Sequence, residues 1–384
     1  MIPYGRQDIS QEDIDAVVSA LKSDWLTQGP AVPEFEAAFA TYCGVAEAVA
    51  VNSATSALHI ACMALGLGPG DWLWTSPLTF VASANAGLYC GASVDFVDID
   101  PVSYNLSVSA LAQKLSDAEK IGRLPKVLVP VHFTGQSCEM REIRQLADQY
   151  GFKIIEDASH AVGANYLDGK VGNCEYADIC VFSFHPVKII TSAEGGMALT
   201  RSQVLAELMR KLRSHGITRD PEQMTQDADG PWYYQQLSLG YNYRMTDIQA
   251  ALGCSQLRRI DGFVARRHEI ADFYDHQLRE LPIILPTRFD YGRSALHLYP
   301  VQIREESGKT RRQVFDGLRE RGIGVNVHYI PVHTQPYYQH LGFKDGDFSE
   351  AEKFYARAIS LPMYPTLTDK DLTKVVAEVK ASLS

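Results

Sequence analysis

The sequence predicts an α/β protein with a mainly parallel central sheet, helices on both faces and a smaller C-terminal α+β domain. Short apolar segments alternate with longer amphipathic ones through most of the chain, which is typical of a parallel sheet. Near Ile260 this alternation gives way to one long amphipathic segment followed by Pro282 and Pro286. The 384 residues, 46% of them hydrophobic, can bury a large core. We therefore expect a large domain over residues 1–258 and a small domain over residues 259–384.

The elements of the large domain follow from hydrophobic periodicity and from capping residues. Ser10 and Asp13 form a capping box that opens the first helix. Continuous apolar runs predict buried strands, and apolar residues three or four apart predict helices. The expected strands are 48–51, 71–75, 93–97, 126–132, 152–157 and 179–182. The expected helices are 10–21, 33–42, 57–65, one ending at 89, 139–150, 201–216 and one beginning near 246.

The same patterns continue in the small domain, where helices and strands are mixed. The expected helices are 263–281, 309–321 and two that begin at 349 and 368, and the expected strands are 297–303 and 325–329. Within the large domain, residues 221–230 gather acidic and amide side chains between two prolines. This composition predicts a surface loop.

Charge and cysteine content exclude several classes of protein. The formal net charge of −10 argues against a nucleic-acid binder. The seven cysteines are scattered without a C-x-x-C pair, which favours free thiols in a reducing compartment over disulfides or a metal site. Residues 1–8 do not resemble a signal peptide, and no apolar run reaches membrane-spanning length. We expect a cytoplasmic protein that binds neither metal nor membrane.

Lys188 is the first candidate for chemistry. It follows the buried segment 179–182 and precedes Glu194-Gly-Gly196, where glycines permit close approach of the backbone. A desolvated lysine has a lowered pKa, and its neutral amine can form a Schiff base with a carbonyl. The alternative is a solvated loop lysine, which is the usual case for an arbitrary lysine.

Four further segments each have two interpretations, and the first three follow expected strands. Asn52-Ser-Ala-Thr55 leads into a helix, so its free amides could bind phosphate or its hydroxyls could simply cap the helix. Asp157 could face a cationic ring nitrogen or lie exposed at a strand end. Phe80 could stack on a flat ring or belong to the core. The loop at 24–27 could line the mouth of a site or connect elements with Trp25 in the core.

These residues together are what pyridoxal 5′-phosphate (PLP) requires. A lysine bonds to the cofactor's aldehyde, a carboxylate keeps its pyridine nitrogen protonated, and a turn holds its phosphate. Seven motifs carry a family resemblance over nearly the whole chain: L-T-Q-G at 26–29, N-S-A-T-S-A-L at 52–58, T-F-V-A at 79–82, E-D-A-S-H at 156–160, S-F-H-P-V-K at 183–188, E-G-G at 194–196 and G-Y-N-Y-R-M at 240–245. The chain resembles the DegT/DnrJ/StrS-type sugar aminotransferases, which have the aspartate-aminotransferase fold (PLP fold type I).

The resemblance implies a role for each matching residue. Lys188 would bind the cofactor covalently and shuttle protons, Asp157 would pair with the pyridine nitrogen, His160 would lie near the ring hydroxyl and Phe80 would stack on the ring. The residues implied to hold the phosphate are Ala54, Thr55 and Ser183, with Asn242 reaching across from a partner subunit. That last role implies a homodimer with composite active sites. Some relatives carry histidine in place of this lysine and are dehydratases, so Lys188 favours transamination.

Within the family, S-F-H-P-V-K, V-N-V-H-Y at 325–329 and P-V-H-T-Q-P-Y-Y at 331–338 look most like the branch that makes pseudaminic acid precursors. Those enzymes aminate the C4 ketone of UDP-2-acetamido-2,6-dideoxy-β-L-arabino-hexos-4-ulose with L-glutamate as donor. The residues implied to line the nucleotide-sugar site are Tyr4, Asp24, Trp25, Leu26, Thr27, Asn326, Val327, His328 and Tyr329, with His185 touching cofactor or substrate or only packing in its loop. The alternatives are amination of a dTDP- or GDP-sugar at C3 or C4, a non-catalytic regulatory protein of the same fold, and a cofactor-free binding module.

Overall fold

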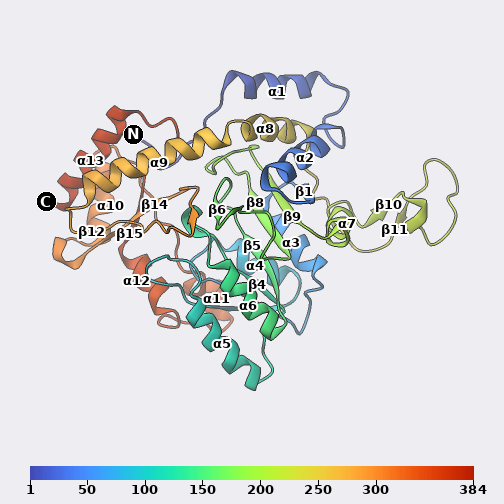
Figure 1. The fold of residues 1–384 in the computed structure, drawn as a ribbon, viewed down its shortest axis with the longest axis horizontal. Helices are drawn as coiled ribbons and strands as arrows, with labels where there is room; N and C mark the ends of the chain where they lie inside the picture. Colours follow the sequence, from blue (N-terminus) through green and yellow to red (C-terminus); the bar gives the residue numbers. More distant parts are fainter.

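The computed structural model describes residues 1–384 and is built on a seven-stranded sheet in the order β1-β9-β8-β5-β4-β2-β3 (Figure 1). The strands β8, β5, β4, β2 and β3 are parallel, whereas β9 runs antiparallel to its neighbours β1 and β8. Their bounds are β1 Glu47–Val51, β2 Trp72–Thr75, β3 Ser93–Phe96, β4 Val127–Val129, β5 Lys153–Asp157, β8 Ile179–Ser183 and β9 Gly196–Thr200. The mainly parallel sheet expected from the sequence is confirmed.

Helices cover both faces of this sheet because successive strand residues point to opposite sides. In β8, Cys180 and Phe182 belong to one hydrophobic core and Ile179 and Val181 to the other. The helices with residues in the first core are α2 (Ala31–Cys43), α5 (Val108–Lys120), α6 (Met140–Tyr150), α8 (Asp247–Leu257) and the start of α9 (Ile260–Leu278). Those in the second core are α3 (Ala54–Ala64), α4 (Ala82–Tyr89), α7 (Gln203–Leu212), α11 (Pro336–His340) and α12 (Ser349–Arg357).

A third core of 23 buried residues forms the C-terminal unit. It lies around a three-stranded antiparallel sheet in the order β12-β14-β15, and the long helix α9 leads into it from the large unit (Figure 1). The elements are α9 Ile260–Leu278, β12 Ile283–Ile284, β14 Tyr299–Ile303, α10 Arg311–Glu320, α12 Ser349–Arg357, β15 Ala358–Leu361 and α13 Asp369–Leu383. Residues at the start of the chain pair with this unit, since Ile2 bridges Ile323 and the Met363 amide donates to the Tyr4 carbonyl at 3.0 Å.

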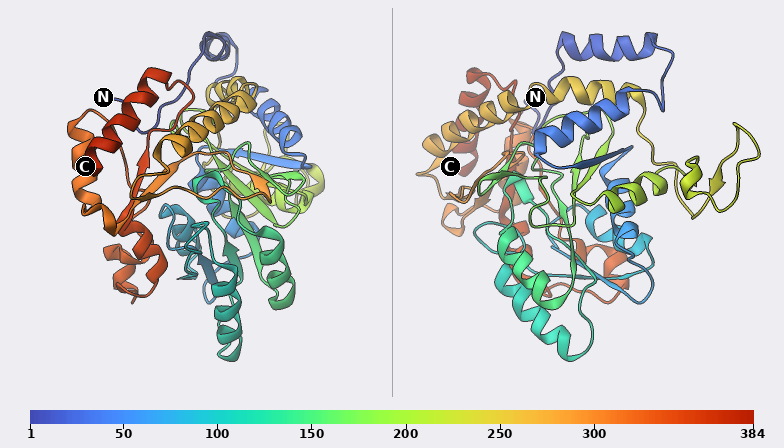
Figure 2. Two further views of the ribbon diagram at one scale, coloured as in Figure 1. Left: turned by 60° about the vertical axis from the view of Figure 1, so that its left-hand side comes forward. Right: turned by 45° about the vertical axis from the view of Figure 1, so that its right-hand side comes forward.

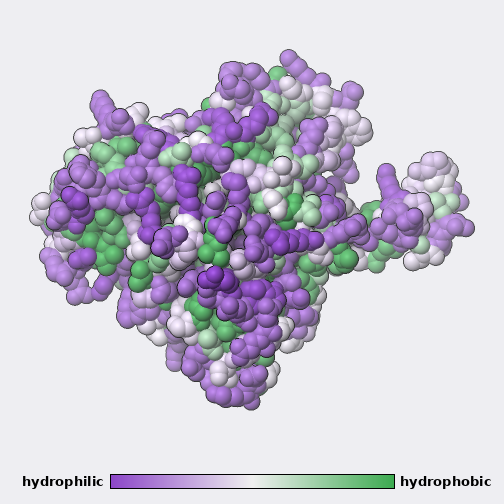
Figure 3. Space-filling model, in the orientation of Figure 1, coloured by the Kyte–Doolittle hydropathy of each residue, from purple (hydrophilic) through white to green (hydrophobic).

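Two parts of the chain project from the body (Figures 1 and 2). Helix α1 (Gln11–Lys22) lies along α8, and the predicted capping box at Ser10 and Asp13 is confirmed at its start. The second projection is an arm that carries β10 (Ile217–Thr218) and β11 (Gln235–Gln236), with hydrophobic side chains near its base (Figure 3). The predicted surface loop at 221–230 lies within this arm.

The remaining elements are short: β6 Asn165–Tyr166, β7 Gly169–Lys170, β13 Gly292–Arg293, α11 Pro336–His340 and the 3₁₀ turns Phe133–Gly135, Pro221–Gln223, Glu305–Ser307 and Val332–Thr334. No helix combines the length and the apolar composition that a membrane crossing requires.

Three expected elements differ from those observed. The strand expected at 325–329 is wrong, because this segment forms only one bridge, between Asn326 and Ser360, and otherwise lines a cavity. The helix expected over 201–216 stops at Leu212, because His215 and Gly216 have positive φ angles of 62° and 71°. The strand expected over 126–132 ends at Val129, before a proline that cannot donate to a ladder.

Candidate active site

A cavity of about 520 Å³ lies at the carboxyl ends of the parallel strands, where open α/β sheets bind ligands. Its lining comes from the ends of β5 and β8, the N-terminus of α3 and the segment 326–329 of the C-terminal unit. The sequence-predicted residues that line it are Tyr4, Ala54, Thr55, Phe80, Asp157, His160, Ser183, His185, Lys188, Asn326, Val327, His328 and Tyr329. Residues distant in sequence are thus brought to one site.

Lys188 lies in this cavity rather than on a solvated loop. Its backbone amide donates to the His185 carbonyl at 2.9 Å, and the next two residues, Ile189 and Ile190, are buried. Loss of water around the ammonium lowers its pKa from 10.5 to about 8, although the Asp157 carboxylate partly offsets this by favouring the charged form. At pH 7 roughly a tenth of the molecules therefore carry Lys188 as a neutral, nucleophilic amine, far more than for an ordinary lysine.

Asp157 ends β5 and is buried, with 5% of its surface exposed. The Ser83 hydroxyl donates to Oδ2 at 2.7 Å, and the Ser159 amide donates to Oδ1 at 3.1 Å. The interpretation of Asp157 as an exposed strand end is therefore wrong. Both donors fix a carboxylate at the cavity, where it suits a cationic ligand group.

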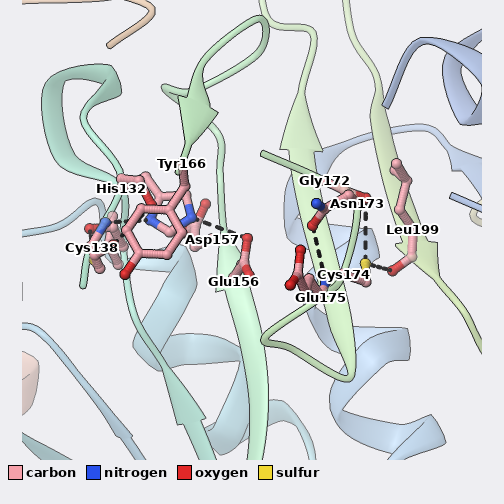
Figure 4. A network of polar contacts seen from close by, with 12 residues as sticks. His132, Cys138, Glu156, Asp157, Tyr166, Gly172, Asn173, Cys174, Glu175 and Leu199 are labelled. Carbon is pink, nitrogen blue, oxygen red and sulfur yellow. Dashed lines mark hydrogen bonds and ion pairs between the residues drawn. The ribbon is translucent and has the colours of Figure 1, made fainter. Parts of the chain in front are cut away.

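His132 and Glu156 form a buried pair near Asp157 that joins the ends of β4 and β5 (Figure 4). The Cys138 amide donates to His132 Nδ1 at 3.1 Å, so Nε2 carries the proton and donates to the Glu156 carboxylate at 3.1 Å. The backbone amide of His132 also donates to the Asp157 carbonyl at 3.0 Å. This buried pair ties the ends of β4 and β5 together and so fixes the position of Asp157.

His160 is a buried, neutral histidine on the cavity wall. Its Nε2 lies 3.0 Å from the Tyr329 hydroxyl, and its Nδ1 is buried without a hydrogen-bond partner. Burial lowers the pKa of His160 well below its ordinary value, and the nearby Lys188 charge acts in the same direction. The ring of His297 packs on it with centroids 4.5 Å apart and also lines the cavity. An unpaired nitrogen at this wall is available to a ligand.

The N-terminus of α3 offers an anion site. Ser53 caps the helix by accepting from the Ser56 amide at 3.1 Å, so the amides of Ala54 and Thr55 have no acceptor within the helix. Ser183, at the end of β8, lines the same part of the cavity. Gly196 permits this arrangement, because a Cβ there would lie 2.6 Å from the Ala54 nitrogen. These free amides at the positive end of a helix suit a phosphate.

Phe80 lines the cavity with 59% of its surface exposed. The interpretation of Phe80 as a core residue is therefore wrong. Its ring lies 6.3 Å from that of Tyr329 and presents an apolar face to the cavity, which suits stacking on a flat ring.

The remaining predicted residues lie outside the cavity of a single chain. Trp25 and Leu26 are 54% and 49% exposed, so Trp25 does not belong to the core either. Thr27 forms a bridge with Thr246, Asp24 precedes it on the surface, and none of these residues lines the cavity. Asn242 bridges Ser214 and accepts from the Asn52 side chain at 3.4 Å through its carbonyl.

Sequence reasoning missed Ser83, Ser159 and His297 at this site. Ser159 lies inside the E-D-A-S-H motif, and its place two residues after a strand-end Asp is typical of a turn in which the carboxylate accepts a backbone amide. Ser83 and His297 lie far along the chain from Asp157 and His160, and nothing in their local sequence marks them.

Comparison with known proteins identifies the chain's relatives. The model of the DegT/DnrJ/EryC1/StrS aminotransferase family matches residues 7–380. The UDP-4-amino-4,6-dideoxy-N-acetyl-beta-L-altrosamine transaminase of Campylobacter jejuni is 40% identical over 97% of this chain and 94% of that protein. The GDP-perosamine synthase of Caulobacter vibrioides is 38% identical over 94% of this chain and 93% of that protein.

Solved structures agree with these matches. Helicobacter pylori PseC, an aminotransferase involved in the biosynthesis of pseudoaminic acid, has a TM-score of 0.91 and 32% identity over 100% of this chain and 99% of that one. The PLP-form of a putative sugar aminotransferase from Streptococcus pneumoniae has a TM-score of 0.88 and 28% identity over 100% of this chain and 98% of that one.

The cavity fits PLP on its own geometry. It joins an amine of lowered pKa, a fixed carboxylate, free helix amides and an exposed aromatic face in a space of about 520 Å³. The predicted fold, enzyme class and cofactor are therefore confirmed. The chain belongs to the DegT/DnrJ/EryC1/StrS aminotransferase family and is a PLP-dependent sugar aminotransferase.

Proposed function

We propose that this enzyme transfers the amino group of L-glutamate to the C4 ketone of UDP-2-acetamido-2,6-dideoxy-β-L-arabino-hexos-4-ulose, a step in pseudaminic acid biosynthesis. The observation that carries the proposal is one polar, aromatic wall that shares the cavity with Lys188. This wall consists of Tyr4 and the segment 326–329. The similarity to the Campylobacter jejuni transaminase and the Helicobacter pylori aminotransferase supports the choice of substrate.

The wall has the composition that a nucleotide sugar requires. The Tyr4 ring lies 5.3 Å from that of His328 at a tilt of 53°. Burial lowers the pKa of His328 from 6.5 to about 3, so its ring is neutral, and its Nδ1 hydrogen-bonds the Ser360 hydroxyl at 2.9 Å. Aromatic rings, the Asn326 amide and neutral imidazole suit a uracil base and sugar hydroxyls.

Our proposed mechanism assigns one task to each catalytic group. Bound PLP supplies an electron sink that stabilises negative charge at the carbon undergoing proton transfer. Lys188 Nζ takes a proton from the α carbon of glutamate, and in the second half-reaction Nζ delivers a proton to C4 of the sugar. Its pKa of about 8 lets the same amine accept and release protons near neutral pH.

The other groups hold the cofactor in position. Asp157 would pair with the pyridine nitrogen and favour its protonated form, and Ser83 keeps that carboxylate oriented. The free amides of Ala54 and Thr55, with Ser183, would hold the phosphate. The unpaired Nδ1 of His160 would hydrogen-bond the ring hydroxyl, Phe80 would stack on the ring and His185 would border the substrate.

We further propose that the enzyme is a homodimer with composite sites. Helix α1 exposes Ile14, Val18 and Leu21, which are 46%, 37% and 54% accessible. The projecting arm exposes Trp232 at 71% and Tyr234 at 51%. Such exposed apolar surface is typical of a protein interface. In this dimer Asn242 and the loop 24–27 would complete the partner's cavity.

We also propose that the chain forms two domains, residues 1–258 and residues 259–384. We propose in addition that the protein is cytoplasmic. The break lies between α8 and α9, and every residue of the third core follows it, together with a minority of the residues of the two large cores. The location is supported by seven free cysteines, which suit a reducing compartment.

A second candidate substrate is a GDP- or dTDP-keto-sugar aminated at C3 or C4, which the similarity to the GDP-perosamine synthase favours. The test is to offer the UDP, GDP and dTDP keto-sugars separately with glutamate and to identify products by mass spectrometry and NMR. We expect the UDP-linked L-arabino ketone to give a C4 amine with the highest kcat/KM. A higher kcat/KM with a GDP- or dTDP-sugar would overturn the assignment.

A further inference from the structure

The two ring nitrogens of His160 have different surroundings. Nε2 lies 3.0 Å from the Tyr329 hydroxyl, whereas Nδ1 is buried and has no partner within the chain. Neighbouring rings hold the imidazole in place, with centroids 4.5 Å away at His297 and 6.0 Å away at Phe133. The nitrogen that bears the proton therefore decides whether His160 offers a donor or an acceptor to a ligand in the cavity.

His160 carries one ring proton and not two. Burial lowers its pKa well below the ordinary value, and the charge of Lys188 acts in the same direction. Its neighbours His297 and His328 are neutral for the same reason, since burial lowers the pKa of each of them as well. At neutral pH the His160 ring is therefore neutral, with an N–H on one nitrogen and a lone pair on the other.

Tyr329 decides which nitrogen carries that proton. Burial raises the pKa of the Tyr329 hydroxyl, so the hydroxyl stays protonated, and its one hydrogen bond within the chain is to His160 Nε2. If the hydroxyl donates, Nε2 accepts and the N–H on Nδ1 is the one group left without a partner. If Nε2 donates instead, both the hydroxyl proton and the Nδ1 lone pair lack partners within the chain. The first arrangement leaves fewer polar groups unpaired and is therefore favoured.

We propose that Tyr329 is a positioning residue that fixes His160 as a hydrogen-bond donor to the ring oxygen of PLP. The Tyr329 hydroxyl donates to Nε2, which keeps the His160 proton on Nδ1, and Nδ1 donates to the cofactor. This inference rests on the proposed place of His160 beside the ring hydroxyl.

A donor at Nδ1 complements the role proposed for Asp157. A hydrogen bond to an oxygen favours its ionised form, just as a carboxylate favours the protonated form of the ring nitrogen. Asp157 and His160 lie three positions apart in the E-D-A-S-H motif. This one segment would thus set the charge on both polar atoms of the ring, and Tyr329 of the C-terminal unit would set the tautomer on which the second of these contacts depends.

The first experiment measures the tautomer of His160 in the cofactor-free protein at pH 7. With ¹⁵N in the histidine rings, long-range ¹H–¹⁵N NMR spectra distinguish the protonated nitrogen from the bare one. The His160→Asn variant identifies the signals of His160 among the 11 histidines. We expect the parent protein to carry the proton on Nδ1. In Tyr329→Phe the proton should move to Nε2, which a free neutral imidazole prefers, whereas the control Tyr337→Phe, at a 60% exposed side chain, should keep the parental tautomer.

The second experiment measures the dissociation constant of PLP in a double-mutant cycle. Tyr329→Phe should raise this constant about fivefold, because the donor tautomer of His160 is no longer stabilised. His160→Asn places an amide nitrogen at the same position along the side chain as Nδ1, and that amide is a donor whatever its neighbours are. Adding Tyr329→Phe to His160→Asn should therefore change the dissociation constant by less than about twofold.

Three results would overturn the proposal. A proton on Nε2 of His160 in the parent protein would reverse the direction of the hydrogen bond. The parental tautomer in Tyr329→Phe would show that the hydroxyl does not set it. Equal losses of PLP affinity in the parental and His160→Asn backgrounds would leave Tyr329 a packing role only. The tautomer of the parent is measured without cofactor or sugar, so this result is independent of the proposed substrate and of whether the variants fold.

Discussion

The Tyr329 hydroxyl lies 3.0 Å from Nε2 of His160 and joins the two units of the protein at the active site. His160 follows β5 of the central sheet, whereas Tyr329 belongs to the irregular segment of the C-terminal unit. The cavity is therefore shaped by a contact between residues 169 positions apart in the chain.

Replacement of Tyr329 by Phe should destabilise the protein. His160 is buried and its Nδ1 already lacks a partner, so the variant leaves both ring nitrogens unpaired at a cost of about 1–3 kcal/mol. Urea unfolding of the cofactor-free protein measures this change. Tyr337→Phe, which removes the same atom from a 60% exposed side chain, is the control. Equal unfolding midpoints for the two variants would contradict the role of the contact.

Replacement of Asp157 by Asn should leave the fold intact and reduce kcat by at least about a hundredfold. Asparagine keeps a carbonyl oxygen for the Ser159 amide but loses the charge that favours a protonated pyridine nitrogen. Steady-state kinetics with glutamate and keto-sugar measure the loss, and Asp168→Asn, at an exposed position, is the control. Activity of Asp157→Asn within twofold of the control would exclude a role for the charge.

Capture of PLP by the cofactor-free protein should depend on pH through Lys188. Burial lowers the pKa of this lysine to about 8, and only the neutral amine reacts. The rate of appearance of visible absorbance should therefore rise up to about pH 8 and then level off. A rate that keeps rising towards pH 10.5 would mean that the amine is not desolvated.

The same shift predicts the pH dependence of stability. The folded pKa of about 8 lies below the unfolded value of 10.5, so between these values the unfolded chain binds more protons at this site. Its contribution to the stability of the cofactor-free protein should therefore increase from about pH 8 to pH 10.5. In Lys188→Met this part of the pH dependence should be absent, as measured by urea unfolding across that range.

Mixing two inactive variants should restore activity if the sites are composite. Lys188→Ala removes the catalytic amine, and Asn242→Ala removes a group that we propose reaches the partner's site. A mixed dimer would hold one site in which both residues are native. Random exchange of subunits should therefore recover about a quarter of the parental activity. Sedimentation as a monomer, or no recovery after exchange, would contradict the composite site.

Local sequence patterns were enough to predict most of the strand-end residues that line the cavity. Apolar runs ending at Ser183, Asp157 and Asn52 mark strand ends, and parallel strands bring such ends to one edge of the sheet. Phe80 and Lys188 lie in segments that follow expected strands, so the same argument predicts that they lie at this edge of the sheet. These positions depend on short-range patterns, which a single sequence carries.

The partners of those residues were not predictable in the same way. The Ser83 bond to Asp157 and the packing of His297 on His160 join positions far apart in the chain. The segment 325–329 has the apolar alternation of a strand. Its only β-bridge joins Asn326 to Ser360, and residues 326–329 line the cavity. Tertiary packing overrides local preference at that segment.

The most direct test is borohydride reduction of the PLP-loaded protein, followed by proteolysis and mass spectrometry. The account predicts one modified residue, Lys188, carrying the reduced cofactor, together with loss of the yellow colour and of transamination. Lys188→Arg should remain colourless and unmodified under the same treatment. Attachment of the cofactor to another lysine, or full activity in Lys188→Arg, would contradict the central claim.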